Sequence, residues 1–422
     1  MSGLTRRRLL ATTGLVAATV PLGVLASRPA TAGADPYQEA FAEAVAADRN
    51  IRRFTEPGRE IWYRPGQLLV APADLARVQS RLRQWDYPTS VGERFAGVAR
   101  LLFGADVAVP SIVSRLRDPQ SWDGSRPPSV QPHHVVVGHG NIMGNPTSAP
   151  AAANPLPSPD PAHGDDGKGV LVGVCDTGIW KEAGSYHPKW LGGAYTPTTT
   201  DEDPLYAYDD VLALEGGHGT FVAGVLRQSA PGVAFDPQPA LTPSGIGDEQ
   251  MLTNAMAVVG QKSHLINLSL GCTTQDDVPS MPIANALAAL PGGVVVVASA
   301  GNAASSRPQW PAAFPSVVAV AATTFDGKLT HPTPYSNYGN WVDACAEGGW
   351  VSTYVKGQLL LGSVPPVWFD GYASWAGTSF AAPFVTGRIA RLMTDRGITA
   401  ADAVAELLTG PSGPPGYGVL VN

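Results

Sequence analysis

The chain has 422 residues, more than one typical domain needs and enough for a large core with a smaller second module. Because 44% of the residues are hydrophobic and 15% are charged, the composition excludes a disordered chain. The net charge of −7 disfavours nucleic acid as a partner, so we expect none.

The first 32 residues have the features of an export signal. Residues 5–10, Thr-Arg-Arg-Arg-Leu-Leu, resemble a twin-arginine signal, and a mildly apolar stretch follows over residues 9–26. An uncleaved membrane anchor is the alternative, but Pro21 breaks the stretch and residues 30–32 (Ala-Thr-Ala) offer a cleavage site. No later segment has the roughly 18 consecutive apolar residues of a membrane span. We therefore expect a secreted protein that keeps no membrane anchor after cleavage.

Residues 33–140 form a smaller module in which strand and helix patterns alternate. Strands are predicted over residues 66–71, 98–103 and 134–137, and helices over residues 73–85 and 109–116. This alternation predicts a split βαβ arrangement, a small α+β domain. His133, His134 and His139 match no standard zinc spacing, so we expect them at an exposed strand end.

Residues 141–167 have the composition of a linker. They contain six prolines among Ala, Ser and Asp residues. Such a segment is extended and poorly packed, so a domain boundary is predicted here, and residues 168–422 form the larger domain.

Three segments of the larger domain carry residues with catalytic chemistry. Asp176 ends an apolar strand over residues 170–175, His218 lies between glycines before a helix, and Ser379 lies just before a helix over residues 380–393. Taken singly, these residues are more often a turn aspartate, a structural histidine and a helix N-cap. Together they supply the acid, base and nucleophile of a serine hydrolase.

A fourth segment, residues 293–302, is a β-branched strand that ends in Gly-Asn. Asn302 alone is typical of a turn.

These segments match the sequence signatures of one protease family. Residues 176–178 are Asp-Thr-Gly, residues 218–224 are His-Gly-Thr-Phe-Val-Ala-Gly, and residues 377–383 are Gly-Thr-Ser-Phe-Ala-Ala-Pro. In motif and in chain order the protein resembles the subtilases, the subtilisin-like serine proteases.

The resemblance implies a serine endopeptidase that hydrolyses peptide bonds through an acyl-enzyme. Ser379 would attack the scissile carbonyl, His218 would act as general base and acid, and Asp176 would orient the imidazole. Asn302 would donate its amide to the oxyanion. No cofactor is needed for this chemistry.

The resemblance also implies where a polypeptide substrate binds. Residues 264–271 resemble the family strand that ends in Ser-Leu-Gly and pairs with the substrate main chain. By this analogy one wall of the pocket for the residue before the scissile bond is formed by Ser269, Leu270 and Gly271. The opposite wall would be formed by Ala300 and Gly301, with Gln309 near the floor.

The expected fold is α/β, with a mostly parallel sheet and helices on both faces. Strands over residues 170–175, 265–270 and 294–298 alternate with helices over residues 221–227, 249–259 and 283–290. By resemblance the module of residues 33–140 is a propeptide, which assists folding and inhibits the enzyme intramolecularly until it is cleaved. A permanent accessory domain is the alternative. We expect a monomer.

The sequence does not decide two structural features, calcium binding and the pairing of the cysteines. Subtilases often bind calcium, and the acidic residues in the loop over residues 195–210 could bind it, but a solvated acidic loop is the simpler interpretation. Three cysteines leave at least one unpaired. A Cys272–Cys345 bridge is compatible with an exported protein, whereas Cys175 is expected to be an apolar core residue.

Two other function classes are a catalytically silent binding protein and a serine hydrolase of another class. A catalytically silent binding protein with a subtilase fold would be expected to lack a triad member, and none is lacking here. An esterase would carry Gly-x-Ser-x-Gly, but Phe380 and Ala381 follow the serine. A sedolisin-like acid protease would replace His218 with Glu.

Overall fold

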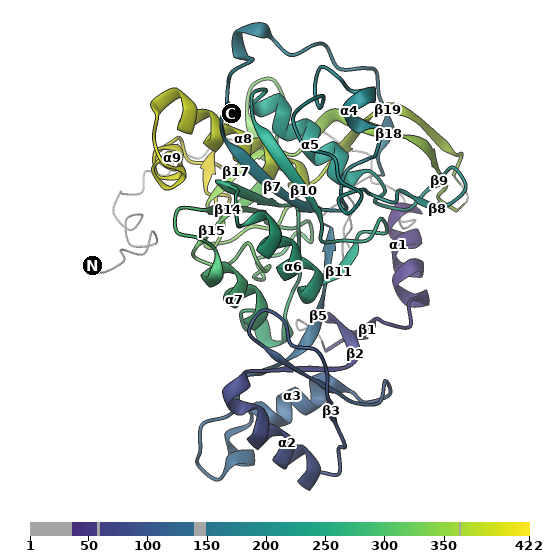
Figure 1. The fold of residues 1–422 in the computed structure, drawn as a ribbon, viewed down its shortest axis with the longest axis vertical. Coiled ribbons are helices and arrows are strands. Elements are labelled where there is room, and N and C mark those ends of the chain that lie inside the picture. Colours follow the sequence, from purple (N-terminus) through teal and green to yellow (C-terminus); the bar gives the residue numbers. More distant parts are fainter. Residues whose placement is uncertain (1–35, 57–59, 139–148, 363) are drawn as a thin grey trace, which may run out of the picture.

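The computed structural model describes residues 36–56, 60–138, 149–362 and 364–422. The predicted export signal and His139 lie outside these residues. Figure 1 shows a small part with α2, α3, β2 and β3 below a larger part with the central sheet. Strand β5 (Val130–Gly138) runs from the small part into the large one.

The larger part is built on a sheet of seven parallel strands in the order β10-β7-β12-β14-β15-β17-β20, with β16 antiparallel to β15. The predicted α/β fold is confirmed. The strands of this sheet are β7 (Leu171–Asp176), β10 (Ala234–Pro239), β12 (Leu265–Leu268), β14 (Val295–Ser299), β15 (Val317–Phe325), β16 (Thr330–Pro332), β17 (Ala344–Glu347) and β20 (Val419–Leu420).

Helices cover both faces of this sheet because its strands are apolar on both sides. In β7, Val172 and Val174 pack with α5 (His218–Ser229) and α8 (Thr378–Arg396), whereas Cys175 packs on the opposite face with α6 (Glu249–Val259) and α7 (Met281–Ala289). Two further helices are α4 (Ala183–Tyr186) and α9 (Ala400–Leu407), and α9 packs on α8. The parallel strands thus bring the ends of β7, β12 and β14 to one edge, where sites are built in such sheets.

The N-terminal part is an antiparallel sheet in the order β5-β2-β4-β3 with helices packed on it. The predicted alternation of strands and helices is present, but α1 and β1 were not predicted. Its elements are α1 (Pro36–Ala47), β1 (Arg52–Phe54), β2 (Ile61–Val70), α2 (Leu75–Gln84), β3 (Ser90–Val91), β4 (Ala99–Leu102), α3 (Val109–Arg117) and β5; short 3₁₀ turns are Pro72–Asp74 and Pro119–Trp122.

A third sheet, in the order β6-β19-β18-β9-β8, lies beside the central one. Its long strand β19 leads directly into α8 and so helps to position the start of that helix. The strands are β6 (Ala151–Ala152), β8 (Tyr206–Tyr208), β9 (Val211–Leu212), β18 (Gly349–Leu359) and β19 (Val367–Ala376). Two more 3₁₀ turns are Pro161–His163 and Gln275–Asp277. Strand β6 lies in the predicted linker, so that segment is partly paired rather than wholly unpacked.

All three cysteines are free and buried, so Cys272 and Cys345 are not bridged. They belong to one apolar cluster with Cys175, as expected for that residue. Burial raises the pKa of each thiol above its usual value. No helix in the described ranges is long and apolar enough to cross a membrane.

Candidate active site

Asp176 and His218 meet at the carboxyl edge of the central sheet. Asp176 is the last residue of β7, and His218 is the first residue of α5. The Nδ1 atom of His218 lies 2.7 Å from Oδ1 of Asp176, and both side chains are fully buried. The amide of Thr177 donates a second hydrogen bond, 2.8 Å, to the same carboxylate oxygen. The carboxylate thus fixes the orientation of the imidazole.

Three carboxylates set the charge state of His218. Burial alone would lower its pKa, but the nearby Asp176, Glu215 and Asp203 outweigh burial and raise it to about 9. Within the described part of the chain, the other ring nitrogen, Nε2, has no hydrogen-bond partner. His218 therefore has one nitrogen held by Asp176 and one available for proton transfer.

Asp203 is a buried residue that sequence reasoning missed. Its carboxylate accepts hydrogen bonds from the Thr177 hydroxyl (2.6 Å) and from the Gly217 amide (2.8 Å). It thereby joins the residue after Asp176 to the residue before His218. Burial raises the pKa of Asp203 to about 6.

The expectation of a solvated acidic loop is accordingly wrong for Asp201 and Asp203, which are 2% and 5% exposed. Both carboxylates are buried because polar groups of the fold hydrogen-bond to them. A single acid in an acid-rich loop carries no sequence signal that marks it as buried. Among the described residues, no group of three or more His, Cys, Asp or Glu side chains could hold a metal ion.

Ser379 lies inside the first turn of α8, not before it. The N-cap residue is Gly377, so the bland interpretation of Ser379 as an N-cap is wrong. As the second residue of the helix, Ser379 has a backbone N–H without an acceptor one turn back. Its hydroxyl lies 3.4 Å from the carbonyl oxygen of Ser269.

Aromatic packing joins the serine helix to the histidine helix. The ring of Phe380, next to Ser379 in the chain, lies 5.4 Å from the ring of His218. Trp375 at the end of β19 contacts the same imidazole edge-on at 5.3 Å. All three rings are buried. The first turn of α8 therefore packs beside the Asp176–His218 pair through these rings.

Asn302 is held in an orientation suited to an oxyanion donor. Its Oδ1 atom accepts hydrogen bonds from the amide (2.9 Å) and the hydroxyl (2.8 Å) of Thr378. Because two donors meet this oxygen, the other terminal atom is the amino nitrogen. That nitrogen, Nδ2, is buried and has no partner among the residues described. It is a donor without an acceptor, next to the residue that precedes Ser379.

Residues of both predicted pocket walls contact the first turn of α8: the Ser269 hydroxyl donates to Ser379 O (2.7 Å), and the Gly301 amide donates to the Thr378 hydroxyl (3.1 Å). Ser269 precedes β13 (Leu270–Gly271), and Ala300 and Gly301 follow β14. Gln309 lies beside Gly301, since a Cβ added to that glycine would be 3.5 Å from its amide carbon. Close by is a cavity of about 300 Å³ whose lining includes Gln309, Arg307, Ala303 and Asn337.

Strand β5 of the N-terminal part lies against the predicted substrate-binding strand. Gly138 is opposite Leu270, and Val137 is opposite Gly271, in antiparallel register. On its other side β5 pairs with β11 (Ile246–Asp248), which the sequence did not predict. The β5 strand thus occupies the central place of a three-stranded ladder whose outer strands both belong to the larger part.

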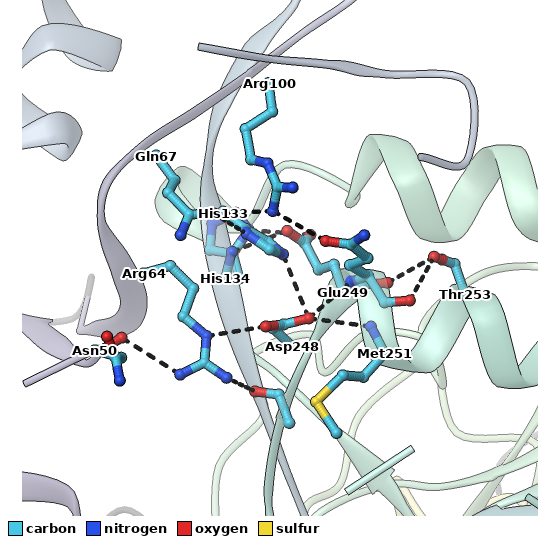
Figure 2. Close-up of polar contacts among 12 residues, drawn as sticks. Asn50, Arg64, Gln67, Arg100, His133, His134, Asp248, Glu249, Met251 and Thr253 are labelled. Carbon is cyan, nitrogen blue, oxygen red and sulfur yellow. Dashed lines mark hydrogen bonds and ion pairs between the residues drawn. The ribbon is translucent and has the colours of Figure 1, made fainter. Parts of the chain in front are cut away.

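A buried polar network anchors β5 to the N-terminus of α6 (Figure 2). The carboxylate of Glu249 accepts hydrogen bonds from the amide of His134 (2.8 Å) and the side chain of Gln131 (2.7 Å). Asp248 accepts a hydrogen bond of 2.9 Å from Arg64 of β2. Burial alone would raise the pKa of both acids, but the groups around them outweigh it and hold both pKa values below the usual range.

The expectation of exposed histidines at a strand end is therefore wrong for His133 and His134, which are each 1% exposed. The side chain of His134 also faces Glu249, and Nδ1 of His133 lies 2.7 Å from Gln67 Oε1. They are buried because β5 lies between two parts of the molecule (Figure 2).

Comparison with known proteins decides the family. The model of the subtilase family (Peptidase S8) matches residues 167–410. The chain belongs to the subtilase family. It is a serine peptidase of that family, and its relatives include thermitase of Thermoactinomyces vulgaris, 29% identical over 57% of this chain and 81% of thermitase. Subtilisin Savinase of Lederbergia lenta is 31% identical over 57% of this chain and 80% of its own length.

Among solved structures, this subtilase is similar to fervidolysin from Fervidobacterium pennivorans, a keratinolytic enzyme related to subtilisin. The TM-score is 0.58 at 19% identity, and the match covers 88% of this chain. The chain spans 61% of the fervidolysin chain. At this identity the likeness shows the fold.

Proposed function

We propose that this subtilase is a secreted endopeptidase that cleaves peptide bonds through an acyl-enzyme on Ser379. The observation that carries the proposal is the 2.7 Å contact between His218 Nδ1 and Asp176 Oδ1. It leaves Nε2 of a fixed imidazole available at a site that also contains Ser379. The relatives named for serine or alkaline proteases support the same chemistry.

In the proposed mechanism, Ser379 Oγ attacks the scissile carbonyl carbon while His218 Nε2 takes the hydroxyl proton. Asp176 keeps the imidazole in the tautomer that accepts at Nε2 and stabilises the imidazolium. The oxyanion receives hydrogen bonds from Asn302 Nδ2 and from the backbone N–H of Ser379. His218 then gives its proton to the leaving amine. In the second half of the reaction, water attacks the acyl-enzyme while His218 takes its proton, and His218 returns that proton to Ser379 Oγ as the acyl group leaves.

We further propose that residues 33–140 are a propeptide and the first ligand of the site. Support comes from β5, which pairs with the substrate-binding strand on one side and β11 on the other. His218 and Ser379 are both 0% exposed in the uncut chain, as expected for an inhibited enzyme. The export signal over residues 1–32 fits an enzyme kept inactive until it leaves the cell.

Labelling with a fluorophosphonate tests the catalytic part of this proposal, because such a probe reacts with an activated serine. The processed wild-type protein should become labelled at Ser379, and the Ser379→Ala variant should not. A processed protein that stays unlabelled would instead be a catalytically silent member of the family.

A further inference from the structure

Glu215 lies directly against the Cα atom of Gly138, the last described residue of β5. A Cβ atom added to Gly138 would lie 2.8 Å from the Glu215 carboxyl carbon and 3.1 Å from one of its oxygens, and it would overlap the other. Real Cβ atoms essentially never come this close to another heavy atom. At this place the carboxylate fills the volume in which a side chain would begin.

The register of β5 identifies which substrate residue this place belongs to. Gly138 is opposite Leu270, and Ser379 Oγ lies 3.4 Å from the carbonyl of Ser269. In an antiparallel pair, a substrate residue that follows the Gly138 position would therefore face Ser269 and the nucleophile. The Gly138 position is the second one before the bond to be cleaved.

Glycine is required here by space and not by backbone conformation. Gly138 is absent from the residues with positive φ and pairs in an ordinary strand, a conformation that any residue can adopt. The amide of Gly138 donates a hydrogen bond of 2.9 Å to the carbonyl of Gly245, which holds the strand at this distance. A larger residue could enter only if Glu215 moved.

The side chain of Glu215 is 0% exposed with β5 in place, so a larger residue at the Gly138 position would require this buried side chain to turn away. The backbone of Glu215 cannot follow easily, because its amide donates to Pro243 O and its carbonyl accepts from His218 N, both at 2.9 Å. Because it lies in the turn that begins α5, a shift of its backbone would also disturb the imidazole. Displacing a packed, buried group to admit one methyl group is unfavourable.

We propose that Glu215 makes this peptidase selective for glycine at the second substrate residue before the cleaved bond. The inference rests on the proposed function, since it takes β5 as a model of the bound substrate. It adds a substrate class, polypeptides with glycine at that position, and assigns the selection to one side chain outside the triad.

Peptide p-nitroanilides test the selection. The reference substrate is acetyl-Val-Val-Gly-His-p-nitroanilide, which has the sequence of residues 136–139, and its two counterparts carry Ala or Lys in place of Gly. Processed wild-type enzyme should cleave the Gly substrate with a kcat/KM about 10- to 100-fold above that of the Ala substrate. Comparing substrates within one enzyme removes any general effect of a variant on the triad.

Two variants of Glu215 distinguish the effect of its side-chain volume on substrate preference from the effect of its negative charge. Glu215→Ala should bring the Gly and Ala substrates to within a few-fold of each other, whereas Glu215→Gln, nearly equal in size, should keep the preference for Gly. Equal cleavage of the Gly and Ala substrates by the wild type would overturn the inference. So would a wild-type preference for Lys that Glu215→Gln abolishes, because the carboxylate would then be a cation-binding group.

A failure of the proposed function would give different results from a failure of the selectivity alone. If processed wild type cleaves none of the three substrates and is not labelled by a fluorophosphonate, the endopeptidase proposal fails and the inference fails with it. If the protein is labelled but shows no preference for Gly, only the selectivity of Glu215 is refuted.

Discussion

The hydroxyl of Ser269 donates a hydrogen bond of 2.7 Å to the carbonyl oxygen of Ser379. Four residues after Ser379 is Pro383, which lies inside α8 and has no N–H to give to that carbonyl. Ser269 supplies the missing donor. The segment proposed to bind substrate thereby holds the backbone of Ser379.

Replacing Ser269 with Ala should leave the buried carbonyl of Ser379 unpaired and lower the free energy of unfolding by about 1–3 kcal/mol. Pro383→Ala restores the N–H one turn along the helix, so the double variant should recover part of this loss. Urea unfolding of the four proteins in a Ser379→Ala background, which prevents self-digestion, measures the cycle. Strictly additive effects would contradict this role of Ser269.

Replacing Asn302 with Asp should lower kcat by about 10²–10³-fold with a much smaller change in KM, because it turns the oxyanion donor into an acceptor. The variant keeps an oxygen for the hydrogen bonds from Thr378. Initial-rate kinetics on a peptide p-nitroanilide measure the effect. A rise in KM at constant kcat would show that Asn302 binds the ground state and does not act on the oxyanion.

The acidic limb of the pH–rate profile should depend on Glu215. The base must be neutral to accept a proton, and the negative charge of Glu215 is one of the causes that raise the pKa of His218 to about 9. Glu215→Gln removes that charge, so the acidic limb of kcat/KM in the processed enzyme should move to lower pH. An unchanged limb would mean that Glu215 does not influence the base.

The raised pKa of His218 also predicts how the stability of the uncut Ser379→Ala chain depends on pH. Since the folded-state pKa of His218 lies above its ordinary value of 6.5, the protonated imidazole stabilises the fold below that pH. This contribution is lost as the pH rises from about 6.5 to about 9. Thermal melts over this range should show a declining Tm, and His218→Gln should reduce the decline.

Helix α1 should help to keep β5 paired between β11 and β13. Phe41 packs in one apolar cluster with Val135 and Val137 of β5, and the hydroxyl of Tyr37 donates to Leu214 O at 2.7 Å. Phe41→Ala should therefore speed amide hydrogen exchange in β5 of the Ser379→Ala chain, because truncating a buried Phe costs about 3–5 kcal/mol. Glu43→Ala on the exposed side of α1 is the matched control, and equal exchange in both variants would exclude this role.

Much of this arrangement was predictable because the motifs lie where strands and helices of a parallel sheet begin or end. The periodic patterns gave α6 its observed bounds and gave β7 and β14 within a few residues. The chemistry proposed for Asp176, His218 and Ser379 was suggested by their motifs, in which small neighbours and strand ends allow distant segments to approach one another.

The features that could not be predicted from the sequence depend on contacts between distant segments. Helix α1 buries only Tyr37 and Phe41, too few for a clear periodic pattern. The burial of His133 and Asp203 depends on partners far away in the chain, and neither residue carries a local signal. The closeness of Glu215 to Gly138 likewise appears only once β5 is paired between β11 and β13.

The central claim is that Ser379 is a nucleophile whose first substrate is the chain's own N-terminal part. N-terminal sequencing of the secreted wild type and of Ser379→Ala tests it most directly. The register of β5 predicts that the wild type is cut after residue 139 and begins at Gly140, whereas Ser379→Ala keeps the N-terminal part. Identical N-termini in the two proteins would contradict the claim.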